Sequence, residues 1–142
     1  MDALTEVLYT AEATTDAGGR EGHVRSSDGI VEFDLARPKE FKGKGGEGTN
    51  PEQLFAAGYA ACFHGALQLV ARQAKVDIKD SEVSAKVRIG KTEDGLGIAV
   101  TLQVSLPGLD RAVAEDLTAK AHQVCPYSHA TRGNIDVDLV VV

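Results

Sequence analysis

Polar and apolar residues alternate along the first third of the chain, in the pattern of half-buried strands. Two clusters of turn-forming residues, 16–19 and 27–29, interrupt the alternation. A glycine-rich segment, residues 42–48, follows it and is predicted to form a loop. We therefore predict three strands joined by tight turns, over residues 7–13, 23–26 and 30–35.

A long segment without formal charge, residues 54–71, has the composition of a helix that is apolar on every side. Strong signals for a helix start precede it: Thr49 or Asn50 as the cap, Pro51 at the first helical position and Glu52 at the positive end of the helix dipole. We predict that the helix runs to about residue 75.

Two kinds of helix have this composition, a membrane span and the central helix of a globular core. Alanine and glycine dominate the segment, and His64 and Gln68 are polar. Such small side chains contribute little free energy of transfer into lipid, which favours the buried helix. Since a domain of this size has difficulty covering such a helix on all sides, we expect a partner subunit to cover part of it.

The second half of the chain continues with strands and an amphipathic helix. Residues 82–89 and 98–106 alternate as two strands on either side of a turn, and residues 135–141 alternate as a last strand. Between them, residues 109–124 have apolar side chains at helical spacing. The predicted order βββαββαβ is that of an α+β fold with a mainly antiparallel sheet, in one domain spanning residues 1–142.

Bulk composition excludes several classes of protein. Hydrophobic residues make up 43% of the 142 residues and charged residues 25%, as in ordinary globular domains. The net charge of −6 argues against nucleic-acid binding. We expect a cytoplasmic protein with reduced thiols, because the chain shows no secretory-signal pattern and two cysteines do not make a disulfide framework.

The two cysteines, Cys62 and Cys125, are the candidates for chemistry. Burial raises the pKa of a thiol, so a buried Cys62 without help would be inert core filling. To act as a nucleophile it needs a nearby cation, and Arg20 and Arg132 are the candidates. Cys125 follows a helix, whose negative end disfavours a thiolate, unless Pro126 begins a new helical turn. On these grounds Cys62 is the better first nucleophile.

A metal site at these residues is not favoured. Cys62 and His64 lie two positions apart and would project about 200° apart on a helix. His122 and Cys125 are compatible with one ion, but no two further ligands stand at recognisable spacing.

Two segments nevertheless carry a strong resemblance. Residues 50–63, Asn-Pro-Glu-Gln-Leu-Phe-Ala-Ala-Gly-Tyr-Ala-Ala-Cys-Phe, and residues 124–134, Val-Cys-Pro-Tyr-Ser-His-Ala-Thr-Arg-Gly-Asn, resemble the two cysteine motifs of the organic hydroperoxide resistance (Ohr) proteins in the Ohr/OsmC superfamily. His129 stands where asparagine is expected. The resemblance extends over nearly the whole chain.

The resemblance implies a thiol peroxidase that reduces organic hydroperoxides, including those of fatty acids. Cys62 would be the peroxidatic cysteine and Cys125 the resolving one, joined in a disulfide during turnover. Arg20 would stabilise the thiolate, and Glu52 would hold that arginine. The family uses no metal and no bound cofactor, and lipoyl dithiols on a lipoylated protein recycle it. It forms an intertwined homodimer, with antiparallel sheets around long central helices and active sites at the subunit interface.

Two further expectations concern the neighbourhood of Cys62. An apolar wall would suit a greasy substrate, although core packing alone explains its side chains, which are those of Leu54, Phe55, Tyr59 and Phe63. Glu52 precedes Cys62 by ten positions, or about 15 Å along a straight helix. If Glu52 acts beside Cys62, it therefore comes from the partner subunit, or the helix breaks between the two residues.

Two other functional interpretations of the same residues remain open. One is an OsmC-type peroxidase with a different substrate range and reductant. Another is a non-catalytic module that senses redox state or binds lipid in the same apolar surroundings. Turnover with a lipoyl reductant separates these readings, since a sensor oxidises once and stops.

Overall fold

The computed structural model describes residues 2–142, and the chain divides into two compact units, Met1–Pro51 and Glu52–Val142. The α+β class and the order of the principal elements agree with the prediction from the sequence.

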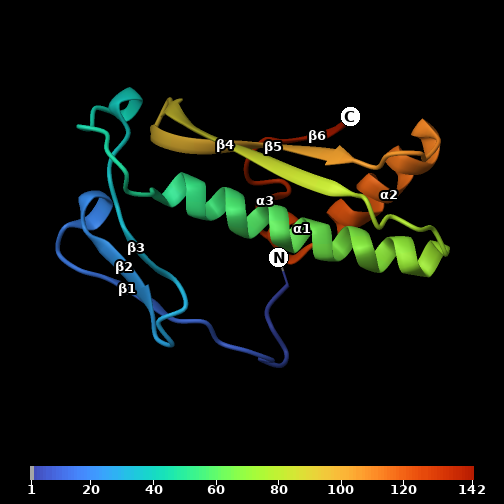
Figure 1. Cartoon of the computed structure of the whole chain (residues 1–142), viewed down its shortest axis with the longest axis horizontal. Helices are drawn as coiled ribbons and strands as arrows, with labels where there is room; N and C mark the ends of the chain where they lie inside the picture. Colours follow the sequence, from blue (N-terminus) through green and yellow to red (C-terminus); the bar gives the residue numbers. More distant parts are fainter. Residues whose placement is uncertain (1) are drawn as a thin grey trace. The chain divides into compact units, whose positions relative to one another are not determined.

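The first unit is a three-stranded antiparallel meander (Figure 1). Its strands pair in the order in which they occur along the chain, and two short 3-10 helices, η1 and η2, punctuate the unit. The elements are β1 (Ala13–Thr15), η1 (Gly19–Glu21), β2 (His23–Ser26), β3 (Glu32–Asp34) and η2 (Lys39–Phe41).

The first strand is shorter and later than predicted. Residues 7–12 are not in a strand, and Val7 and Tyr9 are 65% and 80% exposed. The reason is the length of the partner strand: Ala13 pairs with Ser26, where β2 ends at its turn. Alternation marks a segment able to form a strand, but a strand also needs a neighbour to receive its backbone hydrogen bonds.

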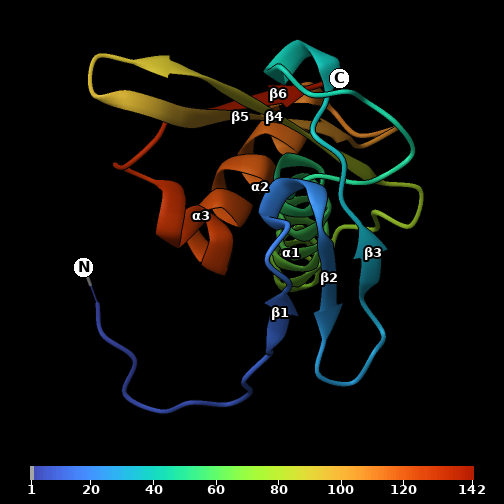
Figure 2. The same ribbon diagram turned by 90° about the vertical axis from the view of Figure 1, so that its left-hand side faces the viewer.

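The second unit places three helices on one face of a three-stranded sheet (Figures 1 and 2). Its strand order is β4-β5-β6, with β4 and β5 joined in an antiparallel hairpin. The elements are α1 (Pro51–Ala74), β4 (Glu82–Thr92), β5 (Gly95–Ser105), α2 (Arg111–Val124), α3 (Pro126–Thr131) and β6 (Val137–Val141).

Two details of this unit differ from a simple antiparallel arrangement. The last strand, β6, runs parallel to β5, because the helical crossover through α2 and α3 returns the chain to the end of the sheet where β5 begins. The short helix α3 is an additional element, starting at Pro126 immediately after α2.

The core of the second unit lies between the sheet and the helices. Inward-facing side chains of β5 alternate with less buried ones, as expected for a sheet covered on one face. They pack against side chains from α1 and α2 that are also fully or nearly fully buried. The set comprises Val100, Leu102 and Val104 from β5, Tyr59, Phe63 and Leu67 from α1, and Leu117 and Ala121 from α2.

Helix α1 is the one helix within residues 2–142 that is long and apolar enough to cross a membrane by length and composition. A single helix of this kind is weak evidence, because core helices pass the same test. Its mean hydropathy over the most apolar stretch is 1.4, and 33% of that stretch is buried within one chain. The helix therefore packs on one side while much of its apolar surface stays uncovered.

Candidate active site

The fold brings the two thiols together although they are 63 positions apart in the sequence. Cys62 lies in the middle of α1 and Cys125 at the junction of α2 and α3, with 3.6 Å between the sulfur atoms. Both are free thiols, and Cys125 is oriented to donate its S–H to the Cys62 sulfur. A disulfide requires about 2.05 Å between the sulfurs, so a shift of about 1.5 Å joins them.

Cys125 owes its position to two helix ends that meet at one residue. It closes α2, where its N–H donates to the Ala121 carbonyl, and it is the N-cap of α3, where Pro126 occupies the first helical position. The Ser128 N–H donates to the Cys125 sulfur at 3.5 Å. Since one helix dipole disfavours a thiolate here and the other favours it, the dipoles no longer distinguish Cys125 from Cys62.

Burial distinguishes the two thiols instead. Cys125 is fully buried, whereas Cys62 is partly exposed. Within one chain Cys62 is therefore the more accessible thiol, and its role as the first nucleophile stays a prediction.

The pKa of Cys62 is raised, and the largest cause is its desolvation by the surrounding protein. The Tyr127 N–H opposes this by donating a hydrogen bond to the sulfur, and the nearby Cys125 adds to the increase. Within the second unit, Cys62 thus favours the thiol, so ready ionisation requires a further positive charge.

The two candidate cations have different surroundings. Arg132 donates to the backbone carbonyl of His122 and so caps α2. Arg20 lies in η1 of the first unit, with its guanidinium carbon 5.1 Å from the centre of the Phe41 ring. A role for Arg20 at Cys62 stays a prediction.

Glu52 lies in the first turn of α1, which runs without interruption to Ala74. Of the two arrangements expected from the sequence, a break in the helix between Glu52 and Cys62 is therefore excluded. Ten residues of α-helix rise by about 15 Å, so Glu52 and Cys62 of one chain lie about that far apart along the helix axis.

The four residues predicted to form an apolar wall separate into two groups. Tyr59 and Phe63 are fully buried in the core, while Leu54 and Phe55 are partly exposed. Phe55 and Tyr59 form a cluster with Tyr127, in which ring centres are 5.6 to 6.1 Å apart. A substrate-binding role for these side chains stays a prediction.

Sequence reasoning overlooked Tyr127, which is 39% exposed beside Cys62. Its ring lies against Gly58 of α1, where an added Cβ would come within 2.7 Å of the hydroxyl oxygen. The signal was present: a glycine within a helix that otherwise favours alanine often marks the close approach of another group.

A second feature that the sequence did not reveal is a chain of hydrogen bonds behind the thiols. The Tyr59 hydroxyl contacts the hydroxyls of Ser128 at 2.8 Å and Thr131 at 2.9 Å. The Ser128 hydroxyl also contacts Nδ1 of His122 at 2.7 Å. This hydroxyl chain, formed by Tyr59, Ser128, Thr131 and His122, connects all three helices of the second unit.

The histidines and acidic residues give little support for a metal site. Across residues 2–142, no three side chains of histidine, cysteine, aspartate or glutamate form a group suited to an ion. His64 bonds to the Ser81 hydroxyl at 2.8 Å, and His122 bonds within the hydroxyl chain.

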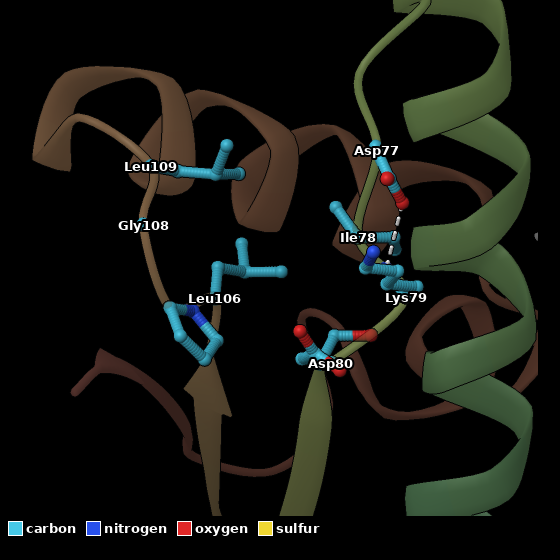
Figure 3. A pocket seen from close by; sticks show the side chains of 9 residues that line it. Asp77, Ile78, Lys79, Asp80, Leu106, Gly108 and Leu109 are labelled. Atoms are coloured by element: carbon cyan, nitrogen blue, oxygen red, sulfur yellow. Dashed lines mark hydrogen bonds between the residues drawn. The ribbon is translucent and has the colours of Figure 1, made fainter.

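A hollow of about 210 Å³ lies between the loop after α1 and the loop after β5 (Figure 3). Polar side chains line its α1 side, where Asp77 accepts a hydrogen bond from the Lys79 N–H, and Leu106 and Leu109 line the opposite side. Neither cysteine lines it, so the candidate chemistry lies elsewhere.

Comparison with known families places this geometry in context. Residues 43–140 match the family of OsmC-like proteins. The chain is 54% identical to the organic hydroperoxide resistance protein of Xanthomonas axonopodis pv. citri, over 99% of both chains. It is 52% identical to the organic hydroperoxide resistance protein OhrB of Bacillus subtilis, over 93% of this chain and 96% of the relative.

Solved structures show the same fold. An organic hydroperoxide resistance protein from Legionella pneumophila has a TM-score of 0.90 at 50% identity, covering 96% of this chain and 98% of its own. The structure of Bacillus subtilis OhrB has a TM-score of 0.88 at 50% identity, covering 96% of this chain and 100% of its own.

The contact between Gly58 and Tyr127 predicts a packing defect. Gly58→Ala should displace the Tyr127 ring and lower the free energy of unfolding by about 1–3 kcal/mol through overpacking, a cost that exceeds the gain of up to about 1 kcal/mol from alanine in a helix. Tyr127→Phe in the same chain removes the hydroxyl oxygen and should restore part of the loss. Chemical denaturation measures the free energy of unfolding, and the near-ultraviolet circular dichroism of tyrosine reports the displacement of the ring. A Gly58→Ala variant that is as stable as the parent and has an unchanged tyrosine signal contradicts the prediction.

Two histidines should titrate on opposite sides of the ordinary histidine value of about 6.5. Burial, and then the charge of Arg132, lower the pKa of His122, whereas hydrogen bonds to Asp34 and Glu32 raise the pKa of His23. Neutral His122 stabilises the fold above about pH 6.5, and this stabilisation is lost as the pH falls from there through the lowered pKa of the folded state. Protonated His23 stabilises the fold below about pH 6.5, and this stabilisation is lost as the pH rises through the raised pKa of the folded state.

An NMR titration of the histidine ring protons checks the order of the two pKa values. His122→Gln should also weaken the loss of stability below about pH 6.5, as measured by denaturation at several pH values. A His122 that titrates at or above His23 is incompatible with this assignment.

Proposed function

The chain belongs to the OsmC-like family and, within it, to the organic hydroperoxide resistance proteins, and from this premise we propose that it is a thiol peroxidase that reduces organic hydroperoxides to alcohols. The observation that carries the proposal is the approach of the two free thiols to 3.6 Å. A buried cysteine alone is ordinary core filling, but a partly exposed thiol with a second thiol behind it is equipped for a two-step redox cycle.

The proposed cycle uses each thiol once. The Cys62 thiolate attacks the distal oxygen of the hydroperoxide, the O–O bond breaks, and the alkoxide takes up a proton and leaves as the alcohol. Cys62 is then a sulfenic acid, whose sulfur Cys125 attacks, forming the disulfide and releasing water. An external dithiol reduces the disulfide by exchange and restores both thiols.

The side chains around Cys62 favour an apolar substrate. Leu54, Phe55 and Tyr127 are partly exposed near the thiol-bearing face of α1, and their contact with a hydrocarbon chain would add binding energy that hydrogen peroxide lacks. We propose organic hydroperoxides, including those of fatty acids, as the substrate class. Tyr59 and Phe63 contribute by supporting this surface from the core.

The positive charge that Cys62 needs is assigned to Arg20, and Glu52 is proposed to hold that arginine. Since α1 is unbroken, the Glu52 that serves a given Cys62 comes from a partner subunit in a homodimer. The incomplete burial of α1 and the exposed apolar residues near the N-terminus, Leu4, Val7, Leu8 and Tyr9, support such an intertwined dimer.

The remaining features of the proposal follow the family. The reductant is a lipoyl dithiol on a lipoylated protein, with no bound cofactor or metal, and the protein acts in the cytoplasm without a membrane or nucleic-acid partner. The competing readings are an OsmC-type peroxidase with another substrate range and a non-catalytic redox-sensing or lipid-binding module.

Steady-state kinetics test the central proposal. The protein should reduce tert-butyl hydroperoxide faster than hydrogen peroxide, and with dihydrolipoamide rather than thioredoxin as the donor. Cys62→Ser should abolish turnover, because no other thiol reaches the peroxide first. Cys125→Ser should still form a sulfenic acid but no intramolecular disulfide, as seen by mass spectrometry. A single oxidation without turnover would show a sensor instead.

Mixed dimers test the placement of Glu52. Mixing the Cys62→Ser and Glu52→Gln variants should restore activity. A mixed dimer then holds one complete site, which takes Cys62 from one chain and Glu52 from the other. After random exchange of subunits, roughly one site in four is complete. A mixture of Cys62→Ser with Cys125→Ser is the control and should show no recovery, since these thiols act within one chain. If the first mixture is no more active than its separate components, Glu52 does not act across the interface.

A further inference from the structure

The hydroxyl chain has a definite direction, because each hydroxyl carries one proton to donate. The Thr131 hydroxyl donates to the Ser128 carbonyl at 3.3 Å. Thr131 therefore accepts from the Tyr59 hydroxyl, which in turn accepts from the Ser128 hydroxyl. Ser128 has then no proton left for His122, so Nδ1 of His122 must carry one and donate it.

All four members of the chain are removed from solvent to a large degree. Tyr59 and Ser128 are fully buried, Thr131 is 5% exposed, and His122 is partly buried. Because a buried hydroxyl without a partner is costly, the pairings resist disruption. These hydrogen bonds hold two successive turns of α3 against Tyr59 on α1. Tyr59 lies one helical turn before Cys62, on the same face of α1.

Helix α3 also carries the two backbone N–H groups that reach the sulfurs. The Ser128 N–H donates to the Cys125 sulfur at 3.5 Å, and the Tyr127 backbone lowers the pKa of Cys62. A helix of six residues has little internal rigidity, so its position depends on what it packs against. The hydroxyl chain provides that support immediately behind the two sulfur contacts.

We infer that Tyr59 is a positioning residue for the thiol chemistry, which acts through its hydroxyl by holding α3, and with it Cys125 and the Tyr127 N–H, in register with Cys62. This inference rests on the proposed peroxidase function and deepens it. It gives Tyr59 a role distinct from the substrate wall expected from the sequence.

Tyr59→Phe tests the inference, because it keeps the ring and removes only the hydroxyl. The pKa of Cys62 should rise, and the rate of disulfide formation after oxidation should fall about tenfold, the equivalent of one lost hydrogen bond. Thr92→Val, which removes an exposed hydroxyl from the end of β4, is the control and should leave both unchanged. Thiolate absorbance against pH and rapid-mixing kinetics measure the two quantities.

A spectroscopic signature separates positioning from a general loss of stability. In the parent protein, nitrogen NMR should show the proton of neutral His122 on Nδ1. In Tyr59→Phe, the Ser128 hydroxyl has lost its acceptor and should turn to Nδ1, so that the proton moves to Nε2. A global decrease in stability would not change this tautomer.

A second pair of variants guards against a Tyr59→Phe protein that fails to fold. Thr131→Val removes the acceptor of the Tyr59 hydroxyl and should reproduce the slow disulfide formation, whereas Thr131→Ser keeps a hydroxyl and should restore the parent rate. The inference is overturned if the Cys62 pKa, the His122 tautomer and the rate of disulfide formation are all unchanged in Tyr59→Phe and Thr131→Val. A parent protein that forms no disulfide with hydroperoxide overturns the proposed function instead, and the pKa and tautomer remain measurable without peroxide.

Discussion

The desolvation of Cys62 is the constraint on which the rest of this structure depends. A thiol in the middle of an apolar helix is easily packed and hard to ionise, because burial penalises the thiolate. The second unit compensates in part by aiming the Tyr127 N–H at the sulfur. A further positive charge would complete the stabilisation, and the proposal gives this role to Arg20, held in place by the Glu52 carboxylate of a partner subunit.

The proposed cycle has a second requirement, a resolving thiol within reach of the first, and the junction of α2 and α3 supplies a thiol at that distance. One residue, Cys125, ends one helix and begins the next, so its side chain is held from both directions. Full burial protects it from direct oxidation, while the 3.6 Å separation leaves only a small movement to the disulfide. In the proposed cycle, Cys62 reacts first because it is the more accessible thiol, a distinction that the helix dipoles alone do not make.

Prediction from the sequence succeeded where a single local signal decides the outcome. The start of α1 at Pro51 and the alternation of β4 and β5 were predicted correctly, because the preference of proline for the first helical turn and the side-chain period of a strand are local properties. It failed for residues 7–12, whose alternation lacks a partner strand, and it did not include α3 among the predicted helices. At the site, both cysteines were identified, whereas Tyr127 and the hydroxyl chain were not, since their partners are distant in the sequence.

The sequence by itself determined the chemical groups and the family: two thiols, the motifs around them, and a helix too apolar to stand alone. Only the tertiary structure decided which groups meet. Sequence separation does not encode the 3.6 Å approach of Cys62 and Cys125, the Ser128 N–H directed at the Cys125 sulfur, or the contact of the buried Tyr59 hydroxyl with α3. These are consequences of packing the helices on one face of a sheet, where side chains from distant segments compete for the same space.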